Sequence, residues 1–326
     1  MKLFNLDLHV SIIEDIKSIL RPMGHQVDNW SLSGHCWVFG EKRATVDIVN
    51  ENTWKKLDAN MCDEFYNLYK ETLQGYDGFI AAYPPAFALL YKKFDKPIYT
   101  VAATRYEAPF TGDNEKWDWL NQELVAMIDS GQLIPIANNR YDQLYCERFT
   151  NRNWNYVPSV CDYTNATYNP LDGKGCVIAS RRNYNIDDCK HISSLGRHSW
   201  KDLYSHKAII HIPYNVSIMS AFEQYAANVP LLFPTIRFGR MLPDYLSELM
   251  FEGNSRVHPD LCSDKMLSFG DFYNKDAMPH VILYDSFEEI PELLSSVDLK
   301  EVSNNMKEFN VKKKNMVTKE WEKLLC

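Results

Sequence analysis

Short apolar runs alternate along the chain with longer stretches in which apolar residues recur every three or four positions. In the first half the short runs predict strands, and the amphipathic stretches between them predict helices. The expected strands are Leu3–His9, Gln26–Ser31, Val46–Val49, Gly78–Ala82, Ile98–Ala103 and Leu133–Ala137. The expected helices are Ser11–Leu20, Met61–Leu73, Pro84–Phe94, Trp117–Ser130 and Tyr141–Phe149. Strands separated by helices favour a parallel sheet covered on both faces, as in a Rossmann-like domain.

This alternation stops at residues 151–174, which are rich in Asn, Pro, Tyr and Gly and are typical of a linker. It then restarts with a strand at Gly175–Ala179, a short helix at Trp200–Ser205 and a last helix at Val317–Leu325. A length of 326 residues fits two domains. We therefore expect an α/β fold with domains at 1–160 and 161–310, and a helix at 311–326 that crosses back to the first domain.

The segment Ala208 to Thr235 predicts a strand, a turn, a helix and a second strand. Ser217 or Ser220 is expected to cap the helix. A strand that leads into a helix start presents unpaired backbone N–H groups and the positive end of a dipole, which suit a phosphate. Glu223, one turn further on, could accept hydrogen bonds from a ribose. The segment therefore indicates a site for a nucleoside diphosphate, and the alternative is a plain αβ crossover with a solvated Glu223.

The spacing of Ser220, Glu223 and Pro230 at i, i+3 and i+10 resembles the nucleotide-binding signature of GT-B glycosyltransferases. In that class the helix start holds the donor diphosphate and the glutamate holds the ribose. The resemblance implies two Rossmann-like domains facing a cleft. It also implies a donor site on the second domain, in which the diphosphate contacts are Tyr214, Asn215, Ser217 and Ser220, and the ribose contact is Glu223.

Two arginines, Arg181 and Arg182, directly follow the first strand of the second half. Ligands of open α/β sheets lie at the carboxyl ends of strands, and arginine offers a planar fork of donors to a diphosphate. The GT-B resemblance supports a role for Arg181 in stabilising the leaving diphosphate, because many members place cations after this strand. The alternative is a solvated basic loop. Trp200 and Tyr204 stand where GT-B enzymes shape the pocket for the donor base, and we expect both to be packing residues.

A loop after the next strand carries Arg237, Phe238 and Arg240, which we expect to face the same site and to contact donor phosphate or acceptor. Asp244 and Glu248 continue onto a following helix, where we expect them to be solvated.

The acceptor side is expected at strand ends of the first half, where His9, His35 and Glu107 follow three predicted strands. An inverting glycosyltransferase needs a general base beside the acceptor hydroxyl, and aspartate, glutamate and histidine are the usual residues. A retaining enzyme relies on the donor phosphate and on electrostatic stabilisation instead, and needs no such base. The three residues are therefore candidate bases, with Glu107 and His35 favoured over His9, and a structural hydrogen-bonding role is the alternative for each.

Several classes of protein are disfavoured by motifs that the chain lacks. No Asp-x-Asp pair is present, which favours a mechanism without a metal ion or other cofactor. Neither a Gly-x-Gly-x-x-Gly turn after the first strand, nor a P-loop, nor a Gly-x-Ser-x-Gly elbow occurs. A net charge of −8 argues against nucleic acid as the main partner. The absence of a long apolar run and of a signal peptide indicates a cytoplasmic protein with no membrane span and with reduced thiols.

Together these patterns favour a metal-independent hexosyl- or pentosyltransferase. It would move a sugar from a UDP-sugar, more readily than from a GDP-sugar, to a hydroxyl of a glycan, lipid-linked or protein-linked acceptor. Two alternatives stay open at this point. One is a UDP-sugar 2-epimerase on the same scaffold, and the other is a non-catalytic two-domain protein that binds a ligand.

Overall fold

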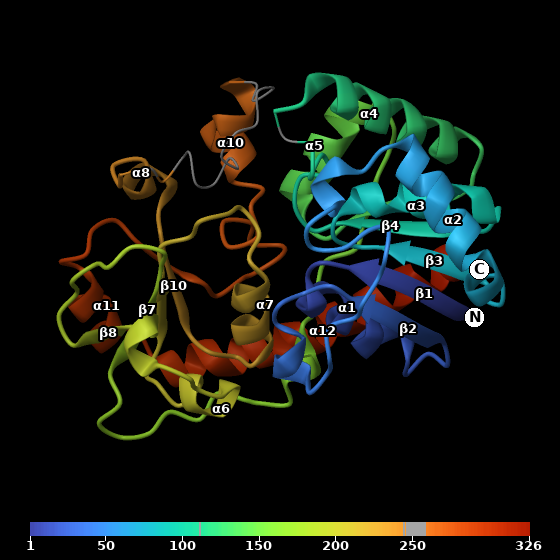
Figure 1. Ribbon diagram of the computed structural model, residues 1–326. Coiled ribbons are helices and arrows are strands. Elements are labelled where there is room, and N and C mark those ends of the chain that lie inside the picture. Colours follow the sequence, from blue (N-terminus) through green and yellow to red (C-terminus); the bar gives the residue numbers. More distant parts are fainter. Residues whose placement is uncertain (111, 244, 246–258) are drawn as a thin grey trace. The chain divides into compact units, whose positions relative to one another are not determined.

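The computed structural model describes residues 1–326 except 111, 244 and 246–258, and it divides the chain into two compact units (Figure 1). Among the described residues, unit 1 comprises Met1–Ser159 together with Thr318–Cys326. Unit 2 comprises the described residues between Val160 and Val317. The last helix, α12 (Leu299–Leu325), therefore contributes its first part to unit 2 and its end to unit 1.

Unit 1 contains one parallel sheet with the strand order β2-β1-β3-β4-β5-β6. Its strands are β1 (Lys2–Asp7), β2 (Gln26–Ser31), β3 (Gly78–Ala81), β4 (Ile98–Ala102), β5 (Leu133–Ala137) and β6 (Asn155–Tyr156). Its α-helices are α1 (Val10–Leu20), α2 (Ala59–Leu73), α3 (Ala88–Tyr91), α4 (Asn114–Asp129) and α5 (Arg140–Thr150). Helix α1 lies on one face of the sheet, and α2, α3 and α4 lie on the other (Figure 1).

The core of unit 1 is built from apolar residues of central strands. The ring of Phe79 on β3 stacks on that of Tyr91 with 4.4 Å between centroids, and Phe4 on β1 packs edge-on against both. The Tyr91 hydroxyl accepts a hydrogen bond from the Leu6 backbone N–H at 3.0 Å, so this buried polar group is satisfied. Strand β3 approaches β4 so closely that a Cβ at Gly78 would lie 2.9 Å from the Pro97 carbonyl oxygen. Only glycine fits this position without a backbone shift.

Unit 2 contains a second parallel sheet with the order β11-β10-β9-β7-β8. Its strands are β7 (Cys176–Ala179), β8 (Cys189–His191), β9 (Ile209–His211), β10 (Leu231–Pro234) and β11 (Ile282–Tyr284). Its described helices, besides the first part of α12, are α6 (Trp200–Leu203), α7 (Met219–Ala226), α8 (Ile236–Gly239), α10 (Asp264–Leu267) and α11 (Ile290–Ser296). Helix α12 packs on α7, where Asn310 Nδ2 donates to the Tyr225 carbonyl oxygen at 2.8 Å.

Two parallel sheets with crossover helices confirm the predicted α/β class with two Rossmann-like folds. One predicted strand is wrong: Val46–Val49 forms bends and not a strand. Val46 and Val49 are nevertheless 3% and 0% exposed, so their apolar character anchors a loop into the core.

Candidate functional site

The predicted donor residues follow two adjacent strands of unit 2. Strands β7 and β9 pair in parallel and end at Ala179 and His211. The loop with Arg181 and Arg182 follows β7, and residues 212–218 connect β9 to α7. Because parallel strands end at the same edge of a sheet, the structure brings the two loops together, as the sequence predicts.

A cation–π contact joins these two loops. The Arg181 guanidinium carbon lies 4.4 Å from the centroid of the Tyr214 ring. Burial raises the pKa of the Tyr214 hydroxyl, and the Arg181 charge partly opposes this rise. Arg181 and Arg182 are both exposed. The stack holds a cation at the carboxyl edge of the sheet, where a phosphate group can reach it.

Helix α7 begins without a side-chain cap, so the prediction that Ser217 or Ser220 caps it is wrong. The N-cap is Ile218, whose aliphatic side chain has no atom that can accept a hydrogen bond from the helix start. Ser217 is 6% exposed, and its Oγ has no hydrogen-bond partner among the described residues. Ser220 is exposed on the first turn, and Asn215 is buried. An uncapped helix start leaves backbone N–H groups that can bind an anion.

Glu223 lies on the second turn of α7 and is only 9% exposed. The Tyr163 hydroxyl donates to its Oε1 at 2.5 Å, and Trp200 Nε1 donates to its Oε2 at 3.3 Å. The two aromatic rings pack edge to face with 6.3 Å between centroids. These contacts fix the carboxylate in one orientation. The hydrogen bonds from Tyr163 and Trp200 were not expected from the sequence, because both donors lie far from Glu223 along the chain.

A buried histidine fixes α7 against the sheet. His211 Nε2 lies 2.6 Å from Gln224 Oε1, and the His211 ring stacks on Phe233 with 4.6 Å between centroids. Burial lowers the pKa of His211 to about 4, so the side chain is neutral near pH 7. His211 therefore positions the helix and does not supply a cation to the site.

The loop after β10 is held by ion pairs. Arg237 pairs with Asp285 at 2.9 Å, and Arg240 pairs with Asp264 at 2.6 Å. Both guanidinium groups therefore already have carboxylate partners, and both pairs are substantially exposed. Asp244 and Glu248, which the sequence predicts to be solvated, lie outside the described residues.

Two of the three candidate bases lie at the surface of unit 1. His9 follows β1, His35 follows β2, and these strands pair along their whole length. Both histidines are exposed, and they are close enough for their charges to interact. The His9 ring also packs edge-on against Tyr83 with 5.8 Å between centroids. This edge of unit 1 therefore offers two imidazoles to an acceptor hydroxyl.

Glu107, the third candidate, lies inside unit 1 and is 1% exposed. Its Oε1 accepts a hydrogen bond from the Tyr145 hydroxyl at 2.8 Å. Burial raises the pKa of Glu107 to about 7, against the opposing charge of Arg105. A side chain so deeply buried cannot contact a ligand at the surface, so Glu107, which the sequence favours together with His35, is poorly placed to act as a base. His9 and His35 are both accessible.

Sequence patterns missed one further group, Asp7, the last residue of β1. Asp7 is 0% exposed, and it accepts hydrogen bonds from Ser31 Oγ at 2.8 Å and Asn5 Nδ2 at 3.0 Å. Burial raises its pKa to about 7. Its position at a strand end, two residues before His9, is the signal that could have identified it.

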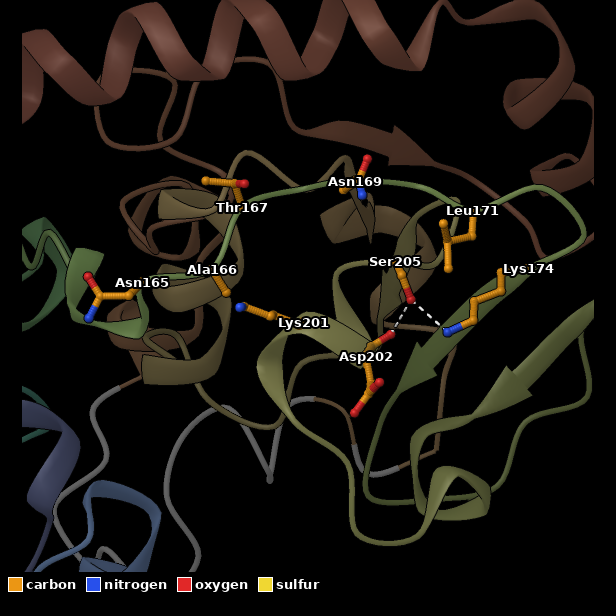
Figure 2. Close-up of a pocket in the computed structure, with 9 residues that line it drawn as sticks. All are labelled: Asn165, Ala166, Thr167, Asn169, Leu171, Lys174, Lys201, Asp202 and Ser205. Atoms are coloured by element: carbon orange, nitrogen blue, oxygen red, sulfur yellow. Dashed lines mark hydrogen bonds between the residues drawn. The ribbon is translucent and has the colours of Figure 1, made fainter.

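A separate cavity of about 320 Å³ lies at the opposite edge of the unit 2 sheet (Figure 2). Lys174 precedes β7 and Ser205 precedes β9, so the cavity is at the amino ends of these strands. Lys174 Nζ donates to Ser205 Oγ at 2.7 Å, and that hydroxyl donates to the Asp202 carbonyl oxygen at 2.6 Å. Lys201 also lines the cavity (Figure 2). None of the predicted donor residues lines it.

Within the described part of the chain, no group of three or more His, Cys, Asp or Glu side chains could hold a metal ion. Among the described helices, none is long and apolar enough to span a bilayer.

Comparison with solved structures places the chain in a fold class. No protein-family model and no curated protein sequence matches it. The glycosyltransferase SnogD from Streptomyces nogalater aligns over 98% of both chains, with 11% identity and a TM-score of 0.50. MurG from Acinetobacter baumannii aligns over 99% of this chain and 98% of its own, with 10% identity and a TM-score of 0.44. A complex of S. aureus MnaA with UDP aligns over 90% and 96%, with 12% identity and a TM-score of 0.36.

The full-length alignment with SnogD and the two parallel sheets show that this chain has a GT-B glycosyltransferase-like fold. At 11% identity the likeness extends to the fold alone.

Proposed function

We propose that this protein is a glycosyltransferase that takes a nucleotide-sugar donor on unit 2 and passes the sugar to a hydroxyl group. The observation that carries the proposal is the fixed carboxylate of Glu223. It lies one turn into an uncapped helix that follows the strand next to the Arg181 loop. A helix start and a cation suit a diphosphate, and an oriented carboxylate suits a ribose diol.

Each donor-side residue has a distinct role in this proposal. The N–H groups at the start of α7, with Ser217 and Ser220 beside them, bind the diphosphate. Arg181 and Arg182 neutralise the charge that develops on the leaving diphosphate when the glycosidic bond breaks. Tyr214 and Asn215 shape the loop that connects β9 to α7. Glu223 accepts hydrogen bonds from the ribose. This division needs no metal ion, because the cations and the helix start stabilise the leaving group.

The acceptor side of the proposal rests on His9 and His35. In an inverting reaction, one of these imidazoles removes the proton of the acceptor hydroxyl as it attacks the sugar. The acceptor hydroxyl belongs to a glycan, which is free, lipid-linked or protein-linked. We propose a UDP-sugar donor ahead of a GDP-sugar.

The proposal is tested first by nucleotide binding. In thermal-shift measurements, either UDP and its sugar derivatives or GDP and its sugar derivatives should raise the apparent melting temperature of the protein. A ligand that binds the folded state stabilises that state. Glu223→Ala should weaken binding of that nucleoside diphosphate by about 1.5–3 kcal/mol, which is roughly tenfold or more in Kd. The same variant should bind the 2′,3′-dideoxy nucleotide as wild type does, because the ribose contact is then already missing.

Glu292→Ala provides the matched control, since Glu292 is an exposed glutamate on α11. It should leave nucleotide binding unchanged. Equal affinity of wild type and Glu223→Ala for the ribonucleotide would refute the ribose assignment. Turnover then distinguishes the remaining alternatives: nucleotide release that requires an acceptor supports transfer, whereas conversion of the sugar without an acceptor indicates the epimerase. The absence of binding by any nucleotide at millimolar concentration would indicate a different ligand altogether.

A further inference from the structure

Two cysteines face each other across neighbouring strands of unit 2. Cys176 on β7 and Cys189 on β8 are register partners in a parallel ladder. Neighbouring strands lie about 4.8 Å apart, which is inside the Cα separation of about 4.4–6.8 Å found in disulfides. Both side chains pack against the same apolar cluster, which contains Ile178 and Ile186. The two thiols therefore lie on the same face of the sheet.

The backbone draws the two strands together at this position. A Cβ at Gly175 would lie 2.5 Å from the carbonyl oxygen of Asp188, so no side chain separates the residues that precede the two cysteines. Asp188 has a φ of 58°, and this left-handed conformation turns the chain into β8. The Cys189 N–H then donates to the Ile186 carbonyl oxygen at 3.1 Å. The close approach is thus built into the main chain beside the thiols.

The surroundings of the pair make one thiol the nucleophile. A hydrogen bond from Cys189 lowers the pKa of Cys176, burial opposes this, and the charge of Lys207 adds to the lowering. The same hydrogen bond raises the pKa of Cys189, so Cys176 is the more acidic thiol of the pair. Cys176 is 3% exposed, whereas Cys189 is half-buried. A small oxidant can reach such a site more easily than a bulky one.

We propose that Cys176 and Cys189 are a redox pair that closes to a reversible intramolecular disulfide when a peroxide oxidises it. The Cys176 thiolate attacks one oxygen of hydrogen peroxide, the O–O bond breaks, and a sulfenic acid forms as hydroxide leaves. The Cys189 sulfur then attacks the sulfenic sulfur. The S–O bond breaks, and the departing oxygen leaves as water with the Cys189 proton. Two thiols lose two electrons in total, and one peroxide is reduced to two waters.

The disulfide would close a loop that contains residues 177–188. This loop carries Arg181 and Arg182, so oxidation restricts the conformations available to the basic loop. Formation of the disulfide is independent of the proposed function. Only a change in nucleotide affinity on oxidation would rest on it.

Tryptic mapping of the full chain tests the pair directly. The protein is treated with hydrogen peroxide, remaining thiols are alkylated, and the protein is digested without reductant. Cleavage after Lys174, Arg181, Arg182 and Lys190 places Cys176 in residues 175–181 and Cys189 in residues 183–190, with one cysteine in each peptide. The expected product is these two peptides joined, with the loss of two hydrogen atoms, and dithiothreitol should separate them again.

Controls use the other thiols of the chain. Cys189→Ser should abolish the joined peptides, and Cys262→Ser, which removes another half-buried cysteine, should leave their yield unchanged. Hydrogen exchange of residues 180–188 should slow in oxidised wild type and not in peroxide-treated Cys189→Ser. Recovery of both peptides alkylated, of Cys176 as a sulfinic acid, or of either cysteine joined to a different peptide would overturn the proposal. The wild-type digest decides the question even where a variant does not fold.

Discussion

At the scale of single residues, the contact between Arg181 and Tyr214 links the two loops of the candidate donor site. The guanidinium carbon lies 4.4 Å from the ring centroid, so the cation is held in place before any ligand arrives. A pre-oriented cation loses less side-chain entropy when it binds a phosphate. Arg181 should therefore contribute to recognition of the diphosphate and not of the nucleoside.

Ligands with and without the diphosphate can show whether Arg181 recognises the diphosphate or the nucleoside. Arg181→Ala should weaken binding of UDP by about 1.5–3 kcal/mol, because a hydrogen bond between charged groups is lost. Binding of uridine should not change. Lys307→Ala, which removes an exposed cation on α12, is the matched control and should leave both affinities as they are. Isothermal titration calorimetry checks the result, and an equal loss for UDP and uridine would mean that Arg181 acts on the nucleoside or on the fold.

Buried carboxyl groups make the stability of unit 1 depend on pH. The pKa of Asp7 rises from 3.8 to about 7 on folding, chiefly through burial. Between these values the folded state keeps a proton that the unfolded state has released. The contribution of Asp7 to the free energy of unfolding is therefore fully present below the pKa that Asp7 has in the unfolded state. It falls as pH rises and levels off above about pH 7. Glu107, with its pKa also raised to about 7, acts in the same direction.

Asp7→Asn should reduce this slope, because the amide does not ionise. A single group changes the unfolding free energy by up to about 1.4 kcal/mol per pH unit in this window. Urea unfolding at several pH values between about 4 and 8 measures it, and part of the slope should remain because Glu107 is still present. Asp47→Asn, at an exposed aspartate, should keep the wild-type slope. A slope in Asp7→Asn as steep as that of wild type would show that Asp7 does not carry the effect.

At the scale of elements, the sequence pattern located some strands residue for residue. The predicted ranges of Gln26–Ser31 and Leu133–Ala137 match β2 and β5 in full. The edge strands β8 and β11 were missed. Each has only three residues; β8 (Cys189–His191) contains no apolar run, and β11 (Ile282–Tyr284) is apolar but very short. The last helix was expected at Val317–Leu325, within a C-terminal segment at 311–326, yet α12 begins at Leu299. Its earlier turns are mostly polar, and their helical state depends on packing against α7.

Only part of the candidate site could be predicted from the sequence, as was the case for the helices and strands. Which residues follow β7 and β9 can be read from the chain, because strand ends are local features. The partners of Glu223 cannot, since Tyr163 and Trp200 meet it only in the folded unit. The burial of Glu107 is also a tertiary property, since it depends on α5, which carries Tyr145. Local spacing thus located the loops that we propose to bind the donor, whereas the exposure of the candidate acceptor residues is known only from the structure.

At the scale of the whole molecule, the proposed mechanism relies on two features of unit 2 to stabilise the leaving group. They are the basic loop after β7 and the uncapped start of α7. In unit 2 the basic loop and the start of α7 both follow the carboxyl ends of neighbouring strands. The described residues contain no cluster of three or more His, Cys, Asp or Glu side chains suited to a metal ion. We propose that the arginines and the helix start stabilise the leaving diphosphate.

Chelation tests this strategy on the intact enzyme. With EDTA in excess, turnover of the nucleotide sugar should stay within about twofold of the untreated rate, since about 0.4 kcal/mol separates rates that differ twofold. Arg181→Ala should instead lose turnover strongly, because the charge on the departing diphosphate is then less neutralised. Added Mn²⁺ or Mg²⁺ should not restore that variant to the wild-type rate. A large loss with EDTA that Mn²⁺ reverses would show that a metal ion stabilises the leaving group, and the roles proposed for Arg181 and Arg182 would then need to be reassigned.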